Sequence, residues 1–146
     1  IPDNSTEAAE VLVKELEVLR KCQHETVVKY YGSCRSRDEL WILMEYCEVG
    51  SVRDMIEICD RPLSEKQIGY TVTQTIRGLS YLHEQCRVIH RDVKCGNILF
   101  NGQLQAKLAD FGVSEQLNLH GKESVMLEDQ AGSPYWMAPE VIEGRG

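Results

Sequence analysis

The chain has 146 residues, of which 42% are hydrophobic and 27% charged, and its 23 acidic and 16 basic side chains give a formal net charge of −7. This is the composition of a soluble globular protein, and the acidic balance argues against a nucleic-acid-binding surface spread over the whole chain. No apolar run approaches the roughly 20 residues needed to span a bilayer, so membrane insertion is not expected.

The first segment of the chain is typical of a helix followed by a β-hairpin. Apolar residues from Ala8 to Leu19 recur at a helical period, with Asn4 or Ser5 as the N-cap. β-branched and aromatic residues then predict a strand over 27–31, and a second strand over 40–46 follows a polar turn. We expect the two strands to form an antiparallel hairpin that packs against the helix.

Helices dominate the next segment. A short helix is predicted over 51–58, and a long one runs from Ser64 to about Gln85, where Ser64 and Gln67 fit a capping box. Gly78, in the interior of the long helix, is expected to permit close packing. The apolar residues of the long helix form one continuous stripe, made of Ile68, Val72, Ile76, Leu79 and Leu82.

The last third of the chain begins with a second hairpin signal. Asn101-Gly102 lies between the apolar runs 98–100 and 105–108, a combination that predicts two paired strands. From residue 110 to residue 140 the chain is polar and without periodicity, so a long irregular loop is expected. Helices and strands are segregated along the chain, which predicts an α+β fold.

The six cysteines show neither a C-x-x-C pair nor a regular spacing. The sequence begins with neither a basic nor an apolar segment, so a secretory signal is not expected. Free thiols and a cytoplasmic location are therefore expected.

Three motifs occur in one order along the second half of the chain. Residues 90–97 (HRDVKCGN) fit H-R-D-x-K-x-x-N, residues 110–112 are D-F-G, and residues 138–140 are A-P-E. Eleven fixed positions in this order make coincidence negligible, although each triplet alone would be weak. On these motifs the chain resembles the protein kinase family, and all 146 residues align with the middle of its catalytic domain.

The resemblance implies a partial two-lobed kinase fold. Residues 1–47 would supply the end of the small lobe up to the hinge between the lobes. Residues 48–146 would supply the first part of the large lobe, with the catalytic loop, the D-F-G motif and the activation segment.

Phosphoryl transfer explains why these residue types recur, because it requires an acceptor held in line and compensation of charge on the phosphate oxygens. Asp92 matches the carboxylate that orients the acceptor hydroxyl and takes its proton, and Lys94 would place a cation on the transferring group. Asn97 and Asp110 supply the amide and carboxylate oxygens that Mg²⁺ prefers. The hairpin between Asn97 and Asp110 is expected to bring both to the same end.

The resemblance also assigns a site for ATP. Glu15 matches the helical glutamate that pairs with the ATP-binding lysine, and Leu99 matches the residue beneath the adenine ring. Met44 resembles the gatekeeper residue at the back of the site. The hinge that would hydrogen-bond adenine is formed by Glu45, Tyr46 and Cys47. An apolar column that couples the lobes would consist of Leu19, Tyr30, His90 and Phe111.

Substrate class follows from the same resemblance. Lys94 together with the run 132–136 (GSPYW) is similar to serine/threonine kinases, and Ser133 would hydrogen-bond near Lys94 in the acceptor pocket. The branch that the chain resembles is the germinal-centre, Hippo-like part of the sterile-twenty group. This similarity is carried by residues 28–33, 40–47 and 50–52.

A departure from that branch concerns regulation. Its members usually carry a phosphorylatable threonine four residues before the position of Ser133, where this chain has Asp129. Arg91 is expected to bind an anion from the activation loop. The carboxylate of Asp129 could pair with Arg91 and order the loop without phosphorylation, or it could be an ordinary solvated side chain.

The sequence contains no glycine-rich loop and no strand lysine of the kinase type. We therefore expect an internal fragment of a kinase domain, poorly stable and inactive alone, with apolar faces such as the 64–85 stripe uncovered. The leading hypothesis is a serine/threonine kinase that uses ATP and Mg²⁺ on protein substrates, with a kinase dimer or scaffold as a further partner. The alternatives are a pseudokinase or binding module, and a truncated product that competes for partners.

Overall fold

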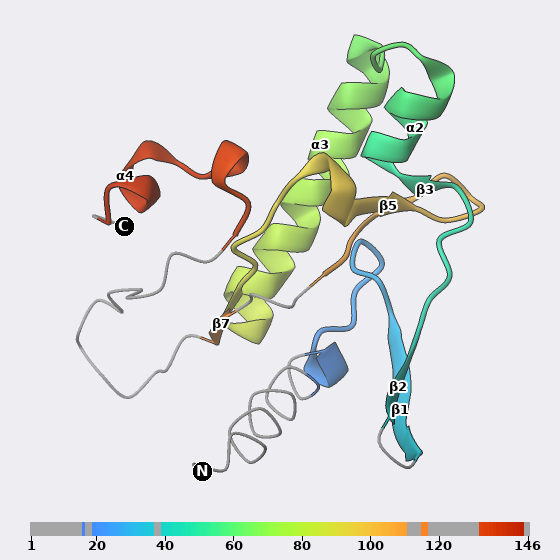
Figure 1. The fold of residues 1–146 in the computed structure, drawn as a ribbon, viewed down its shortest axis with the longest axis vertical. Coiled ribbons are helices and arrows are strands. Elements are labelled where there is room, and N and C mark those ends of the chain that lie inside the picture. Colours follow the sequence, from blue (N-terminus) through green and yellow to red (C-terminus); the bar gives the residue numbers. More distant parts are fainter. Residues whose placement is uncertain (1–15, 17–18, 37–38, 111–114, 117–131, 145–146) are drawn as a thin grey trace.

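The computed structural model describes residues 16, 19–36, 39–110, 115–116 and 132–144. A β1–β2 hairpin projects from a larger part that contains the helices α2 and α3 and a three-stranded sheet in the order β3-β5-β6 (Figure 1). A third, two-stranded sheet pairs β4 with β7. Within the described residues no helix is both long and apolar enough to cross a bilayer.

The elements in chain order are β1 (Tyr30–Ser36), β2 (Glu39–Met44), β3 (Gly50–Ser51), α2 (Val52–Cys59), α3 (Glu65–Tyr81), the π-helix η1 (Leu82–Cys86), β4 (Val88–Ile89), the 3-10 helix η2 (Cys95–Asn97), β5 (Ile98–Phe100), β6 (Ala106–Leu108), β7 (Glu115–Gln116), the 3-10 helix η3 (Pro134–Trp136) and α4 (Pro139–Ile142).

The antiparallel hairpin of β1 and β2 confirms the sequence prediction, but the bounds of its first strand were wrong. β1 begins at Tyr30 and continues through Gly32 to Ser36, with a bulge between Tyr30 and Gly32. Val27 and Val28, which were expected in this strand, are buried and pair with β6 instead. The N–H of Val28 donates to the carbonyl of Leu108 at 2.8 Å, so burial against β6 decides their pairing.

Both α2 and α3 begin with a capping box, which the sequence predicted for α3. Ser64 accepts a hydrogen bond from the N–H of Gln67, whose side chain accepts from the N–H of Ser64, as the predicted capping box requires. Ser51 and Asp54 form the same reciprocal pair at the start of α2. These caps satisfy backbone N–H groups that have no partner inside the helix, and they fix where each helix starts.

The long helix reaches residue 86, close to the predicted end, but it changes type on the way. After Tyr81 the last turn, Leu82–Cys86, is a π-helix, and it ends at Arg87 with a left-handed backbone (φ 57°). Leu82 is completely buried at the start of this turn. The wider turn therefore leads from the helix into β4 while keeping Leu82 in the core.

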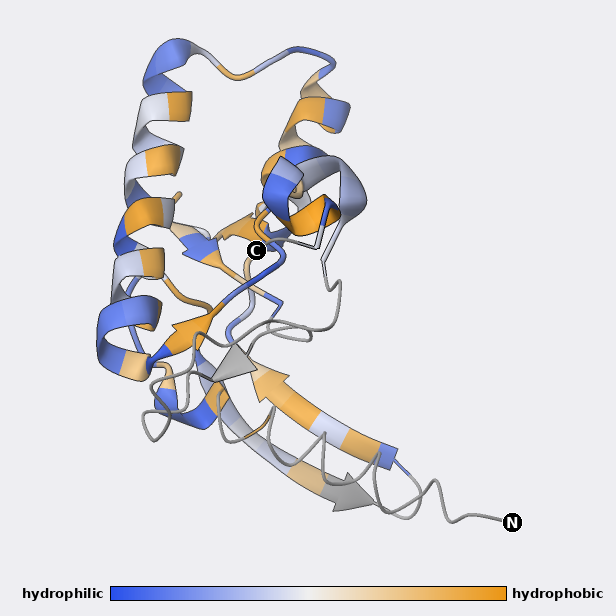
Figure 2. Ribbon diagram, turned by 90° about the vertical axis from the view of Figure 1, so that its left-hand side faces the viewer, coloured by the Kyte–Doolittle hydropathy of each residue, from blue (hydrophilic) through white to orange (hydrophobic). Residues whose placement is uncertain are grey.

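The buried face of α3 differs from its apolar stripe. Small residues, Thr71, Thr75 and Gly78, face the protein, and α3 packs there against β6. Ile68, Val72 and Ile76 are 41%, 48% and 59% exposed, which confirms the expected uncovered stripe for these three residues. Its last two residues differ, because Leu79 packs against the main core and Leu82 is buried in it. Figure 2 shows hydrophobic residues alternating with hydrophilic ones along the full length of this helix.

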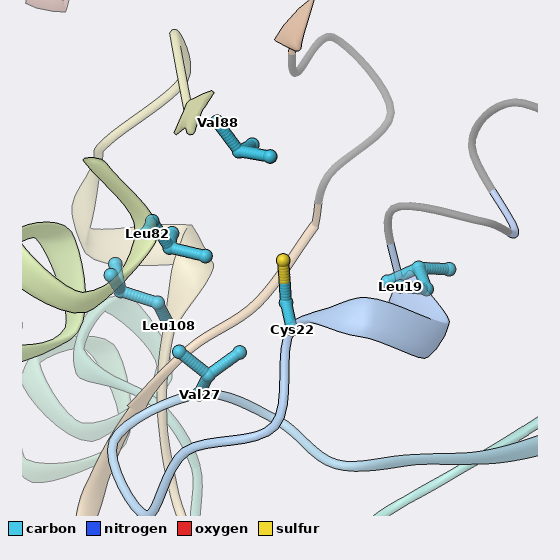
Figure 3. Close-up of a cluster of buried hydrophobic side chains, with 6 residues drawn as sticks. All are labelled: Leu19, Cys22, Val27, Leu82, Val88 and Leu108. Carbon is cyan, nitrogen blue, oxygen red and sulfur yellow. The ribbon is translucent and has the colours of Figure 1, made fainter. Parts of the chain in front are cut away.

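The main hydrophobic core joins residues that are far apart in the sequence. Figure 3 shows Cys22 between Leu19 on one side and Val27, Leu82 and Leu108 on the other. Val88 from β4 completes this cluster of buried residues. Burial and the neighbouring thiol of Cys86 raise the pKa of Cys22 to about 12, so this thiol is protonated at neutral pH. All six cysteines are free, as expected from their spacing.

The second hairpin is present, with a longer turn than the Asn-Gly pair predicted. β5 pairs with β6 so that Ile98 faces Leu108 and Phe100 faces Ala106. The side chain of Asn101 accepts hydrogen bonds from the N–H groups of Gln103 and Gln105, which holds a five-residue loop over 101–105. The expectation of an irregular segment from 110 to 140 was partly wrong, because β7 and η3 lie within it and α4 begins before its end.

Gly78 provides a test of the close packing between α3 and β6. A Cβ atom at this position would lie 2.8 Å from Cδ1 of Leu108 and 3.1 Å from the carbonyl oxygen of Thr26. Gly78→Ala is therefore expected to destabilise the full-length protein by about 1–3 kcal/mol, despite the better helix propensity of alanine. Urea unfolding would measure the change.

The same helix offers a matched control for this substitution. A Cβ atom at Gly69 would meet nothing within 4 Å. Gly69→Ala should therefore stabilise the protein by roughly 0.5–1 kcal/mol. Equal effects of the two substitutions would contradict close packing at Gly78.

Candidate active site

The candidate site is built on the segment between β4 and β5. β4 leads into residues 90–94, and the short helix η2 then turns the chain into β5. Ser133, from a segment about 40 residues further on, lies against this loop through the hydrogen bonds described below. The site thus depends on contacts between two segments that are distant in the sequence.

His90 anchors the start of the loop in the protein interior. It is 1% exposed, its Nε2 lies 3.0 Å from the carbonyl oxygen of Ala109, and the N–H of Asp92 donates to its Nδ1 at 3.3 Å. A carbonyl can only accept and an N–H can only donate, so the ring is the neutral form with its proton on Nε2. Burial lowers the pKa of His90, in agreement with this neutral form.

Asp92 is the centre of the hydrogen-bonded cluster. Its Oδ2 accepts from Nζ of Lys94 at 2.7 Å and from Nδ2 of Asn97 at 2.9 Å. Its Oδ1 accepts from the N–H of Ser133 at 2.9 Å. Nζ of Lys94 also donates to Oγ of Ser133 at 2.6 Å, which confirms the predicted contact of Ser133 with the catalytic loop. Two oxygens of a carboxylate that is only 8% exposed are thereby held in fixed directions.

These contacts also decide the charge of Asp92. Burial by itself would raise the pKa of this carboxyl, but hydrogen bonds from Lys94, Ser133 and Asn97 and the charge of Lys94 outweigh it. The net effect is a pKa below the ordinary value of aspartate. Asp92 is therefore an ionised carboxylate at neutral pH, able to accept a hydrogen bond or a proton.

The β5–β6 hairpin brings Asn97 and Asp110 to the same end, as predicted. Ile98 pairs with Leu108, and the N–H of Ala109 donates to the carbonyl of Asn97 at 2.9 Å. Nδ2 of Asn97 donates to Asp92, so its Oδ1 is the atom of the amide left for a cation. An amide oxygen and the carboxylate of the exposed Asp110 form a donor set that fits Mg²⁺.

Backbone geometry on both sides of the cluster is unusual. Arg91 and Asp110 both have φ of 64°, a left-handed conformation that costs non-glycine residues roughly 1–2 kcal/mol. Such positions persist where surrounding contacts fix them, and they often occur at functional sites. Here Arg91 is the residue directly before Asp92, and Asp110 is one of the two candidate metal ligands.

The residues expected to bind the adenine base lie where β2 meets the β3-β5-β6 sheet. Leu99 is partly buried in the central strand, between Ser51 and Lys107 on its two neighbours. Met44 ends β2 with its side chain 36% exposed, and Tyr46 is 79% exposed. Cys47 is partly buried. The structure thus brings the start of the hinge and Leu99 to one region, while the Tyr46 side chain points into solvent.

A buried ion pair joins these two parts. Nζ of Lys107 lies 2.9 Å from Oε1 of Glu45, and their side chains are only 8% and 18% exposed. The N–H of Glu45 donates to the carbonyl of Lys29 at 2.7 Å, and its Oε2 accepts from the N–H of Lys29 at 3.2 Å. Glu45 is therefore held by Lys29, just before β1, and by Lys107 in the hairpin that carries Leu99.

The structure brings together two residues of the column expected to couple the lobes, Leu19 and Tyr30. Leu19 is buried in the main core cluster, and Tyr30 packs against that cluster. His90 is buried at the carbonyl of Ala109. Three of the predicted site residues, Glu15, Phe111 and Asp129, lie outside the described residues.

Sequence reasoning missed two residues that shape the site. Gly132 has φ of 120°, and a Cβ atom there would lie 2.5 Å from the carbonyl oxygen of Arg91, so only glycine lets Ser133 approach Asp92 this way. The sequence feature that could have identified Gly132 is its position directly before Ser133. Lys107 was the other omission, because a lysine in a predicted strand is usually solvated.

The cluster predicts a loss of stability in acid. The pKa of His90 is lowered in the folded state, so the unfolded protein takes up the proton first as pH falls through about 6.5. The stability that Asp92 contributes through its lowered pKa is present above about pH 4 and is lost below it. Urea midpoints of the full-length protein are therefore expected to decrease from neutral pH downward.

His90→Asn is the control for the first step, because asparagine keeps one donor and one acceptor without titrating. In this variant the decrease that begins near pH 6.5 should be smaller than in the wild type. An identical pH dependence in both proteins would contradict the role of His90.

Comparison with known proteins gives consistent matches over nearly the whole chain. The family profile of the protein kinase domain matches residues 2–146. The chain is 48% identical over 137 residues to the serine/threonine-protein kinase pakG of Dictyostelium discoideum, covering 92% of this chain and 11% of that protein. It is 46% identical over 136 residues to the serine/threonine-protein kinase cst-1 of Caenorhabditis elegans, covering 92% of this chain and 26% of that protein. The chain thus spans between about a tenth and a quarter of the length of these relatives.

Proposed function

The chain belongs to the protein kinase domain family, and on this basis we propose that it is the catalytic part of a serine/threonine kinase. The reaction transfers the γ-phosphoryl group of ATP to the hydroxyl of a serine or threonine in a protein substrate. The single observation that carries this proposal is the cluster in which Asp92 accepts hydrogen bonds from Lys94, Asn97 and Ser133.

The geometry of this cluster supports a division of roles. Asp92 is a fixed carboxylate that can accept the hydrogen bond of an acceptor hydroxyl and take its proton as the new P–O bond forms. Lys94 bridges Oδ2 of Asp92 and Oγ of Ser133, which holds its charge beside the acceptor. That charge would stabilise negative charge on the transferring phosphoryl oxygens.

Asn97 and Asp110 would hold Mg²⁺, and the hairpin between them sets their separation. The bound ion would neutralise charge on the phosphate groups of ATP. Hydrogen bonding of the Asn97 amide to Asp92 links the candidate metal ligand directly to the candidate base.

The nucleotide base would bind where the hinge meets Leu99, with Met44 at the back and residues 45–47 supplying backbone groups. This assignment divides the chain into a small-lobe part, 1–47, and a large-lobe part, 48–146. Arg91, Phe111, Asp129 and Ser133 are proposed as the regulatory residues around the activation segment. A cytoplasmic location and a kinase dimer or scaffold partner stay predictions.

Transfer of the γ-phosphoryl group from labelled ATP tests the proposal. The full-length protein is incubated with Mg²⁺ and matched peptides that differ only in a serine, threonine or tyrosine acceptor. Label is expected on the serine and threonine peptides and not on the tyrosine peptide. Preferential labelling of tyrosine would contradict the substrate class.

The alternative is a pseudokinase or binding module, and it predicts a different result in the same assay. Such a protein would transfer no label to any acceptor. A parallel measurement of ATP binding would then distinguish a nucleotide-binding module from a scaffold that does not bind nucleotide.

A further inference from the structure

A pocket of about 260 Å³ lies beside the candidate catalytic loop, and the cluster described above does not use it. Its walls come from α2, from the loop at residues 94–96 and from the helix η3. Lys94 lines this pocket and also donates to Asp92 at 2.7 Å and to Ser133 at 2.6 Å. The pocket therefore opens next to the point that an acceptor hydroxyl must reach.

The surface of the pocket is mainly apolar. The apolar walls are formed by Ile56 of α2, Cys95 of the loop and Trp136 of η3. Trp136 is 55% exposed. Burying apolar area on these side chains would be favourable. A ligand with an apolar side chain fits this surface better than water does.

Charge in the pocket is largely balanced. Arg53 and Glu57 both line it, and Nε of Arg53 lies 2.7 Å from Oε1 of Glu57. The two charges compensate each other, so the pocket has no single charge that would select an acidic or basic ligand. Lys94, the remaining cation, is already bound to the carboxylate of Asp92.

Gly96 lines the pocket, and there is room for a side chain at this position. A Cβ atom at this position would meet only Cε of Lys94, at the ordinary contact distance of 3.9 Å, and the backbone there is not left-handed. A larger side chain at Gly96 can therefore extend into the pocket without backbone strain.

We propose that this pocket binds an apolar side chain of the protein substrate, one to three residues away from the serine or threonine that is phosphorylated. An extended chain advances about 3.3–3.6 Å per residue, so a peptide whose acceptor lies at Asp92 carries its near neighbours past Lys94. The proposal rests on the proposed kinase function and adds a sequence preference to it.

Peptide kinetics with the full-length protein test the preference. A threonine acceptor is placed in an alanine background, and leucine, lysine or glutamate is moved through the three positions on each side. At one position leucine is expected to raise kcat/KM by roughly tenfold over alanine, with no comparable gain from either charged residue.

Two substitutions test whether this pocket is responsible for the preference for leucine. Gly96→Leu fills the pocket from the loop, and Ile56→Ser makes its α2 wall polar, so each should reduce the tenfold preference to about twofold or less. Ile58→Ser is the matched control, because Ile58 lies on the same helix, is 80% exposed and does not line the pocket. This variant should keep the full preference.

The outcomes distinguish failure of the pocket assignment from failure of the proposed kinase function. Equal kcat/KM for all flanking residues, a preference for a charged residue, or an unchanged preference in Ile56→Ser would each overturn the pocket assignment while the kinase function stands. Absence of transfer to every peptide would overturn the kinase function and, with it, the substrate preference.

Discussion

Asp92→Asn is expected to slow phosphoryl transfer by about 10²- to 10⁴-fold, the range typical for loss of a general base. The substitution keeps the shape of the side chain but removes the charge that pairs with Lys94. It also turns an NH₂ group toward at least one of the donors that now bind the carboxylate, because Lys94, Asn97 and Ser133 together use both oxygens. Steady-state kinetics of the full-length protein would measure the loss in kcat.

The expected pattern separates chemistry from folding and from nucleotide binding. The affinity for ATP should change by less than about threefold, because the proposed adenine contacts lie at the hinge, and the protein should remain folded. Asn101→Asp, at the hairpin turn, is a control that makes the reverse exchange of amide and carboxylate far from the cluster. A kcat of Asp92→Asn within tenfold of the wild type would contradict a base at this position.

Lys107→Met is expected to destabilise the protein by about 3–5 kcal/mol, the usual effect of removing one partner of a buried ion pair. The carboxylate of Glu45, whose side chain is 18% exposed, would lose the ammonium group 2.9 Å away and keep the hydrogen bond from the N–H of Lys29. An uncompensated charge would then remain in the interior. Chemical denaturation of the full-length protein would measure the difference.

Two further variants make this prediction specific to burial. Replacing both partners, as Glu45→Gln with Lys107→Met, should recover most of the lost stability because no buried charge remains. Arg77→Met removes one partner of an ion pair with Glu25 whose side chains are 52% and 58% exposed, and it should cost less than about 1 kcal/mol. Equal losses for Lys107→Met and Arg77→Met would show that burial of the Glu45–Lys107 pair does not matter.

The candidate site was predictable from sequence where its residues are close in the chain or joined by a recognisable turn. Asp92, Lys94 and Asn97 lie within six positions, so their meeting needed only a short loop. Asn97 and Asp110 required the hairpin, which the apolar runs around Asn101 indicated. The contact of Ser133 with this loop came from the resemblance to kinases and not from spacing.

Other features could not be predicted because tertiary contacts override local pattern. Val27 and Val28 have the side chains of a hairpin strand, yet they pair with β6 because the core is on that side. Close packing at Gly78 was predicted, but nothing in the sequence indicated that Thr71 and Thr75 form the rest of the face against β6, where small side chains allow close approach. Lys107 is buried by an ion pair with a residue 62 positions earlier, for which the sequence carries no local signal.

The π-helical turn at Leu82–Cys86 has a consequence for how the chain can vary in length. A π turn holds one more residue than an α turn between the same two ends, so it absorbs an insertion without moving the structure on either side. Removing one residue from the exposed stretch 83–85 would convert it to an α turn and leave Leu82 and β4 close to their present places. Relatives that differ by one residue between the long helix and the catalytic loop can therefore keep the same active-site geometry.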